Sequence, residues 1–223
     1  MTTALATDAE TTWQKLLDGQ SGIRLLEDDF IEKYDLPVRN GGHLHEDFDS
    51  ELTRVELRRL SYLQKMSTVI GRRVWENAGS PDVDPRRLMV SIGTGLGSTE
   101  ELVFAYDGMR ERGLRAVSPL VVQMYMPNGA AAAVGLERKA KAGVSTLISA
   151  CASGPEAIAN AWRQLVLGLI QVESGYRKYA ISSVGARGYM QIMPFWMRLI
   201  GDGDSGKLFH MQTNLRFGCV ILR

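Results

Sequence analysis

The sequence predicts an α/β domain with a largely parallel sheet, followed by a small helical fragment. Short apolar runs of strand type alternate with segments whose apolar residues recur at helical spacing, which predicts the first part. After Gly168 the composition shifts toward methionine, aromatic residues and glycine without a low-complexity linker, which predicts the second part. The expected domains are therefore residues 1–168 and 169–223.

Local patterns predict the elements of the amino-terminal half. A polar opening before apolar residues at helical spacing predicts a helix from Asp8 to Leu17. One apolar stripe opposite arginines and glutamates predicts a single long helix from Leu52 to Trp75. The apolar run at 87–93 predicts a buried strand that enters a glycine-rich turn, after which Ser98 is the expected N-cap of a helix ending at Arg112.

Three more elements follow along the chain. Residues 128–142 predict a helix of small residues, and residues 144–149 predict a short strand. Apolar residues then keep one helical stripe from Pro155 to Ser174. We expect a single helix there, although Gly168 costs about 1 kcal/mol relative to alanine.

Composition excludes several classes of function. Lys and Arg number 26 against 25 Asp and Glu, so the formal charge of +1 lacks the basic excess of a nucleic-acid-binding protein. No apolar run approaches the length of a membrane span, and the first residues lack the features of a secretory signal. The two cysteines, Cys151 and Cys219, are widely spaced, which fits a reducing compartment. We expect a cytoplasmic protein.

Cys151 is the candidate nucleophile. It lies in residues 149–154, Ser-Ala-Cys-Ala-Ser-Gly, where a predicted strand ends and a long helix begins. Small neighbours permit a tight turn and leave room for a ligand. Free N–H groups and the dipole at a helix N-terminus favour thiolate over thiol. The structural alternative is a buried cysteine that packs as a small hydrophobic residue.

These residues occur with other motifs in a specific order. They are Ile-Gly-Thr-Gly-Leu-Gly at 92–97, Val-Ser-Pro-Leu at 117–120 and Met-Pro-Asn-Gly-Ala-Ala at 126–131. Over residues 1–168 the chain resembles the N-terminal half of the elongating β-ketoacyl-acyl carrier protein synthases, which are condensing enzymes of the thiolase fold. Within that family it is most similar to the enzymes that extend very long meromycolate precursors.

The resemblance implies acyl transfer from acyl carrier protein to Cys151 as a thioester, in fatty-acid or mycolic-acid elongation. A malonyl thioester would then decarboxylate, and its carbanion would attack the bound thioester. This step needs an oxyanion hole that includes the Cys151 N–H, and a pair of histidines. His43, His45 and His210 match no family motif. The family's first strand is expected to be missing as well, so we expect a truncated half domain that cannot complete condensation alone.

The tail resembles a different family. Glu173 and Ser174 are followed at 185–194 by Gly-Ala-Arg-Gly-Tyr-Met-Gln-Ile-Met-Pro, which is similar to the core of soluble lytic transglycosylases. That family has a lysozyme-like helical fold and cuts the glycan strands of peptidoglycan. The resemblance implies that Glu173 is the acid that protonates the glycosidic oxygen. Tyr189 departs from the leucine typical of the family, and the far wall of the sugar groove is expected to be missing. The alternative is a solvated glutamate at a helix end.

Other signals carry less weight. The glycine-rich turn suggests a dinucleotide site, but Ser98 stands where the third glycine should be. The pair His43 and His45 with Glu46 suggests a metal, but nothing nearby completes a site. Arginine pairs at 58–59 and 72–73 suggest an acidic carrier protein, although charged helix faces usually need no partner. We expect no cofactor and no metal.

Three hypotheses of function remain. The first is acyl transfer to Cys151, with acyl carrier protein as partner and a homodimer formed through strand 144–149. The second is a peptidoglycan lytic transglycosylase that uses Glu173 and binds glycan. The third is a recombined or artificial chain without evolved activity.

Overall fold

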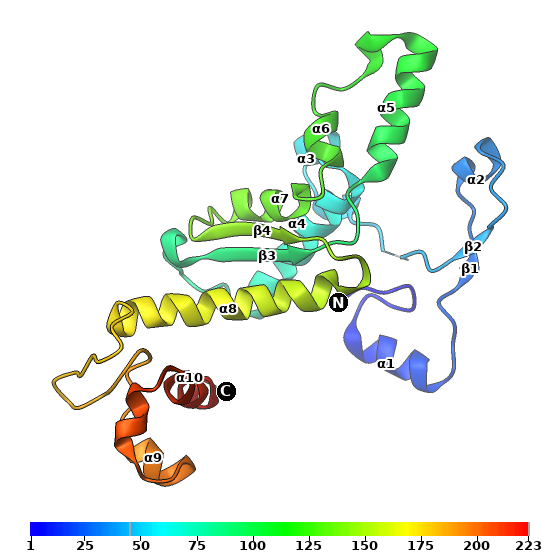
Figure 1. Ribbon diagram of the computed structural model, residues 1–223. Coiled ribbons are helices and arrows are strands. Elements are labelled where there is room, and N and C mark those ends of the chain that lie inside the picture. Colours follow the sequence, from blue (N-terminus) through cyan, green and yellow to red (C-terminus); the bar gives the residue numbers. More distant parts are fainter. Residues whose placement is uncertain (45, 223) are drawn as a thin grey trace. The chain divides into compact units, whose positions relative to one another are not determined.

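The computed structural model describes residues 1–44 and 46–222, and the chain divides into two compact units. The first unit comprises residues 1–88 and 96–142, and the second comprises residues 89–95 and 143–223. The elements of both units are labelled in Figure 1. Helices and a parallel strand pair occur together, which confirms the predicted α/β class.

The first unit is mainly helical. An antiparallel pair, β1 (Arg24–Leu25) and β2 (Asn40–Gly41), lies near its start. The helices are α1 (Ala9–Leu17), α2 (Asp29–Lys33), α3 (Arg54–Arg59), α4 (Tyr62–Asn77), α5 (Thr99–Arg112), α6 (Val121–Tyr125) and α7 (Gly129–Glu137). Helix α1 and helix α5 match the predicted ranges. Helix α7 is shorter than the predicted 128–142, because the chain leaves the helix at Arg138 and Lys139 adopts a positive φ of 56°.

Helices α4 and α7 pack closely because small residues face one another. Ala130 and Ala131 of α7 are fully buried, as is Val69 of α4. A Cβ added to Gly71 would lie 3.2 Å from the methyl groups of Val134. The run of alanines therefore lets the two helix backbones approach closely.

The prediction of one helix from Leu52 to Trp75 is wrong. Leu60 is extended (ψ 134°), which separates α3 from α4. Ser61 then caps α4 in a capping box with Gln64, because its hydroxyl accepts the Gln64 N–H and the Gln64 side chain accepts the Ser61 N–H at 3.0 Å. The hydroxyl of Ser98 donates to Ser61 Oγ at 2.7 Å and does not cap α5. Ser98 therefore stands at the predicted N-cap position of α5, but its side chain makes no capping hydrogen bond.

The second unit is built on a parallel strand pair. β3 (Met89–Gly93) pairs with β4 (Gly143–Leu147) in a register that sets Met89 opposite Gly143 and Gly93 opposite Leu147. Helix α8 (Ser153–Ser174) runs along this pair. The Ser91 hydroxyl donates to the Ala157 carbonyl at 2.9 Å, and the Asn160 amide donates to Ser145 Oγ at 3.0 Å. Side-chain hydrogen bonds from both strands thus fix the helix on the sheet.

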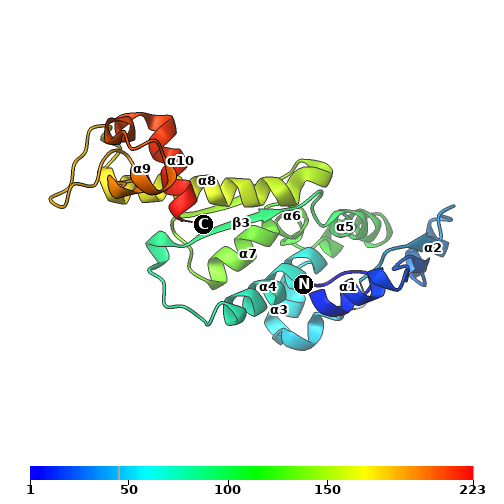
Figure 2. The ribbon, with the colours of Figure 1, turned by 90° about the horizontal axis from the view of Figure 1, so that it is seen from below.

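Helix α8 continues without a break through Gly168, which confirms the prediction of a single helix. It ends where Gly175 adopts the left-handed conformation (φ 57°), a position that glycine occupies at little steric cost. Figure 2 shows the helix as one continuous rod from a second direction. The predicted boundary at residue 168 therefore falls inside an element.

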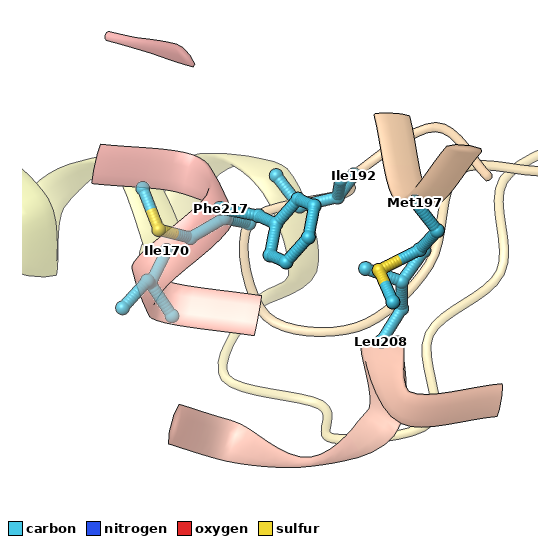
Figure 3. Close-up of a cluster of buried hydrophobic side chains, with 6 residues drawn as sticks. Ile170, Ile192, Met197, Leu208 and Phe217 are labelled. Atoms are coloured by element: carbon cyan, nitrogen blue, oxygen red, sulfur yellow. The ribbon is translucent and has the colours of Figure 1, made fainter. Parts of the chain in front are cut away.

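The tail folds around a core that includes the end of α8. Its elements are α9 (Phe195–Ile200), the 3-10 turn η5 (Ser205–Phe209) and α10 (Met211–Ile221). The core consists of six buried apolar residues, five of which Figure 3 labels: Ile170, Met190, Ile192, Met197, Leu208 and Phe217. Ile170 belongs to α8, so the last turns of the helix form part of the tail's core.

Within the described residues, no helix has the length and apolar character needed to cross a membrane.

Candidate functional site

Cys151 lies in a sharp turn between β4 and α8. The strand ends at Leu147, a 3-10 turn η4 spans Ala150–Ala152, and α8 starts at Ser153. Ala150 has a positive φ of 49°, which is rare for a residue with a side chain. The thiol of Cys151 is free and exposed. The turn therefore presents the sulfur to solvent at the start of a helix, and the alternative of a buried structural cysteine does not hold.

Ser153 holds this turn in place. Its hydroxyl accepts the Ser149 N–H at 2.9 Å and donates to the Ala150 carbonyl at 2.7 Å, and the residue is buried. The hydroxyl of Ser149 donates to Glu156 in the first turn of α8 at 2.6 Å. These bonds oppose relaxation of the unfavourable Ala150 conformation. The sequence placed Ser153 in the motif but gave no sign of this supporting role, because a serine at a helix start serves in many kinds of cap.

The glycine-rich turn packs against the cysteine turn. A Cβ on Gly93 would overlap the Ser153 carbonyl, and a Cβ on Gly95 would lie 3.7 Å from the Ala150 carbonyl. The Thr94 N–H donates to the Leu147 carbonyl at 3.1 Å. Glycine is needed here because two backbone segments approach closely. This packing accounts for the glycines without a bound phosphate, and it disfavours the dinucleotide hypothesis.

Glu173 lies in the last turn of α8, and its side chain is exposed. Glu173 follows Cys151 by 22 residues, so about 33 Å of 3-10 turn and helix separate the two candidates, at about 1.5 Å per residue. The structure does not bring them into one site. The adjacent Ser174 is buried, and its hydroxyl donates to the Ile170 carbonyl at 3.2 Å.

The motif after Glu173 forms a compact loop around Asn214. The amide of this fully buried asparagine donates to the carbonyls of Arg187 and Leu208, both at 2.8 Å, and its Oδ1 accepts the Met190 N–H at 2.7 Å. Gly188 has a φ of 76° and leaves no room for a Cβ beside the Asn214 amide. The position of Asn214 in the sequence gave no sign that it joins three separate stretches of backbone.

The remaining candidates do not form a site. Among the residues that the structure describes, no cluster of three or more His, Cys, Asp or Glu side chains is placed to hold a metal. His45, part of the suggested metal pair, lies outside the described residues.

The arginine pair at 72–73 is engaged within the protein. Arg72 pairs with Glu56 at 2.5 Å and with Glu137 at 3.0 Å, and the hydrogen bonds to Glu137 and Glu56 raise the pKa of Arg72. Arg73 pairs with Glu46 and Glu51. These internal ion pairs make this pair a poor candidate for docking a carrier protein.

Comparison with known families gives two matches. The profile of the β-ketoacyl synthase N-terminal domain matches residues 1–172, and that of the transglycosylase SLT domain matches residues 150–223. The two matches overlap at residues 150–172, which include η4 and most of α8.

Individual relatives support the first match. The chain is 76% identical over 168 residues to 3-oxoacyl-[acyl-carrier-protein] synthase 2 of Mycobacterium tuberculosis and of Mycobacterium leprae, covering 75% of this chain and 40% of theirs. It is 28% identical over 162 residues to the Staphylococcus aureus protein of the same name, covering 71% of this chain and 39% of that protein. The chain thus spans about 40% of the length of these mycobacterial relatives.

Solved structures share the fold. A β-ketoacyl synthase from Burkholderia phymatum matches with a TM-score of 0.60 at 23% identity, covering 74% of this chain and 41% of that one. The ishigamide ketosynthase/chain length factor matches with a TM-score of 0.62 at 16% identity, covering 74% of this chain and 42% of that one. A complex described as a type II polyketide synthase acyl-carrier protein with its ketosynthase matches with a TM-score of 0.58 at 13% identity, covering 74% and 44%. These likenesses confirm the predicted thiolase-like fold.

Proposed function

The chain belongs to the β-ketoacyl synthase family, and on that premise we propose that Cys151 accepts an acyl group from acyl carrier protein. The observation that carries the proposal is the exposed thiol on a strained turn directly before a 22-residue helix. Backbone N–H groups at such a helix start stabilise negative charge on the sulfur and on the oxyanion. The acyl chains would be those of fatty-acid elongation or, because residues 1–168 resemble the enzymes that extend meromycolate precursors, of mycolic-acid elongation.

The transfer balances without a further reactant. Cys151 Sγ forms a bond to the thioester carbonyl carbon, and the carbon–sulfur bond to the carrier breaks. The carrier thiol leaves with the proton that Cys151 gives up. The products are an acyl-cysteine thioester and free carrier thiol, so this half-reaction requires no histidine pair.

Condensation requires more than the described residues provide. His43 belongs to the first unit and His210 to the second, and neither sequence context matches the family's histidine motifs. We therefore propose that the chain alone forms the thioester and makes no β-ketoacyl product.

Partners and location follow from the same premise. An acyl carrier protein is bound to its ketosynthase in one structural neighbour, which supports a carrier as partner here. In the described sheet β4 pairs with β3 alone, so its other edge is available for a homodimer through Gly143–Leu147. The free cysteines fit a cytoplasmic location.

Intact-mass measurement after mixing with an acyl-carrier thioester tests the acyl transfer. We expect one added acyl mass on the wild type and on Cys219→Ser, and none on Cys151→Ala. Cys219 is the matched control because it is the other cysteine of the chain and is partly buried in α10. Unmodified wild-type protein, or equal labelling of Cys151→Ala, would refute the proposal. Adding malonyl carrier should then yield no β-ketoacyl product.

The transglycosylase match supports a second candidate function. Residues 150–223 match that domain, and the tail encloses its own core around Asn214. We propose a boundary near residue 168, with 169–223 as a lytic-transglycosylase-like fragment. If Glu173 acts as its acid, the chain should release anhydro-muropeptides from peptidoglycan, and Glu173→Gln should abolish the release. A chain inactive in both assays would fit the third hypothesis, a recombined chain without evolved activity.

A further inference from the structure

We propose that Glu156 is a positioning residue for acyl transfer: it holds Ser149 and thereby fixes the backbone that presents Cys151. The inference rests on the proposed acyl transfer and adds to it a residue that touches neither the sulfur nor the acyl group. All three residues belong to the second unit.

Ser149 is the residue on which the cysteine turn is anchored. Its N–H donates to Ser153 Oγ at 2.9 Å, and its carbonyl accepts the Ala152 N–H at 3.0 Å. Its hydroxyl donates to Glu156 Oε2 at 2.6 Å. The N–H, the carbonyl and the hydroxyl of Ser149 are thus all engaged. The position of Ser149 therefore sets the path of the two residues that follow it.

The bond to Glu156 differs from the other two. It is the one that joins the turn to a charged side chain, in the first turn of α8. Hydrogen bonds to a charged acceptor are shorter and stronger than those between neutral groups. Within the turn, Ala150 has a φ of 49°, which a residue with a side chain adopts only when its surroundings hold it there. The link between Ser149 and Glu156 therefore supplies part of that constraint.

Helical phase shows that Glu156 acts through the backbone and not on the sulfur. It follows Cys151 by five residues, and the first two steps run through the 3-10 turn into α8. At about 120° for each of these two steps and about 100° for each of the next three, the two side chains point about 180° apart around the axis. A carboxylate on the far side of the helix is not placed to take the thiol proton. Its effect on transfer must therefore pass through Ser149.

The requirements of acyl transfer set the size of the effect. The sulfur and the N–H of Cys151 must both face the carbonyl group of the incoming thioester. Misplacing reacting groups by about 1 Å costs about a hundredfold in rate. Two of the three bonds of Ser149 remain when Glu156 is replaced, so the displacement is smaller and we expect a loss of about tenfold. Seating of the sulfur at the helix start also favours the thiolate, and weakening it should slow simple alkylation by about threefold.

A double-mutant cycle tests the link in the full chain carrying Cys219→Ser. The variants are Glu156→Ala, Ser149→Ala, the combination of both, and Glu156→Gln, which removes the charge but keeps an oxygen that accepts the Ser149 hydroxyl. Intact mass gives two rates for Cys151: acyl transfer from an acyl carrier thioester, and alkylation by iodoacetamide, in which the sulfur displaces iodide.

We expect each alanine variant to be slower by about tenfold in transfer and about threefold in alkylation. The double variant should be no slower than either single one, because both replacements remove the same bond. Glu156→Gln should react at nearly the wild-type rate. Arg163→Ala is the matched control, because it removes an exposed charge about two turns further along the same helix and should leave both rates unchanged.

The outcomes separate this inference from the proposed transfer. Glu156→Gln as slow as Glu156→Ala, or a double variant slowed by the product of the single effects, would overturn the inference. If Glu156→Ala does not fold, Ser149→Ala removes the same bond from the other side and decides the outcome. If the alanine variants slow alkylation but the carrier never acylates the wild type, the positioning holds and the proposed transfer fails. If the carrier acylates every variant at one rate, the transfer stands and the inference fails.

Discussion

Replacement of Asn214 by alanine tests how the tail is held together. The side chain is fully buried and joins the carbonyls of Arg187 and Leu208 and the N–H of Met190 through bonds of 2.7–2.8 Å. Alanine would leave these three backbone groups without their partner in a buried site. Each unsatisfied group costs about 1–3 kcal/mol, and water entering the vacated space recovers part of the loss. We therefore expect a loss of about 3–5 kcal/mol, against a typical total stability of about 5–15 kcal/mol.

Urea denaturation monitored by tryptophan fluorescence and by circular dichroism measures this loss. Trp196 packs against the tail core and reports on it directly. Gln212→Ala is the matched control, because Gln212 is exposed on the same helix and should change stability by less than about 0.5 kcal/mol. Asn214→Asp should destabilise the tail as well, since it turns the amide donor into an oxygen that faces two carbonyls. A loss below about 1 kcal/mol for Asn214→Ala would refute the assigned role.

Three further predictions concern stability. Gly168→Ala should raise stability by about 1 kcal/mol in thermal unfolding, because alanine favours the helix and an added Cβ meets nothing within 4 Å. Gly175→Ala should lower stability, because Gly175 has a positive φ that alanine adopts only at a cost. Ser61→Ala should cost about 1–2 kcal/mol in urea, since it removes the capping box of α4; an unchanged midpoint would contradict this.

The third is a pH dependence. The Thr53 N–H lowers the pKa of Glu56 below its ordinary value of 4.5; burial opposes this, and the Thr53 hydroxyl and Arg72 lower the pKa further. The stabilisation that the Glu56 carboxylate contributes is therefore complete above its ordinary pKa of 4.5. It is lost as the pH falls through the lowered pKa that Glu56 has in the folded protein. Stability curves of wild type and Glu56→Gln should converge in that acidic range, and curves that stay parallel would exclude ionisation of Glu56 as the cause.

Local patterns predicted the cysteine turn and the long helix well. Small residues around Cys151 and the later apolar spacing fix a strand, a turn and a helix within one short stretch of chain, so no distant contact had to be known. The uninterrupted apolar stripe from Pro155 to Ser174 likewise predicted that α8 would continue through Gly168.

Features that depend on distant contacts were missed. The break between α3 and α4 was not predicted, because the apolar stripe continues in phase across Leu60. Only the capping residues Ser61 and Gln64 mark the start of the second helix. The partners of Arg72 lie 16 and 65 residues away in the chain. Apolar spacing carries no information on such pairs. The positive φ of Ala150 could not be predicted from the sequence either, since it arises from the hydrogen bonds of Ser153 and not from the alanine itself.

The continuity of α8 has a mechanical consequence for the junction at Gly168. Ala157 packs toward the strands and Ile170 toward the tail, and both are fixed on one rigid rod. Inserting one residue between them would turn one packing face by about 100° relative to the other and displace it by about 1.5 Å. Inserting seven would restore the rotation to within about 20° while moving the tail outward by about 10 Å. The junction thus tolerates changes of length only in steps of whole helical repeats.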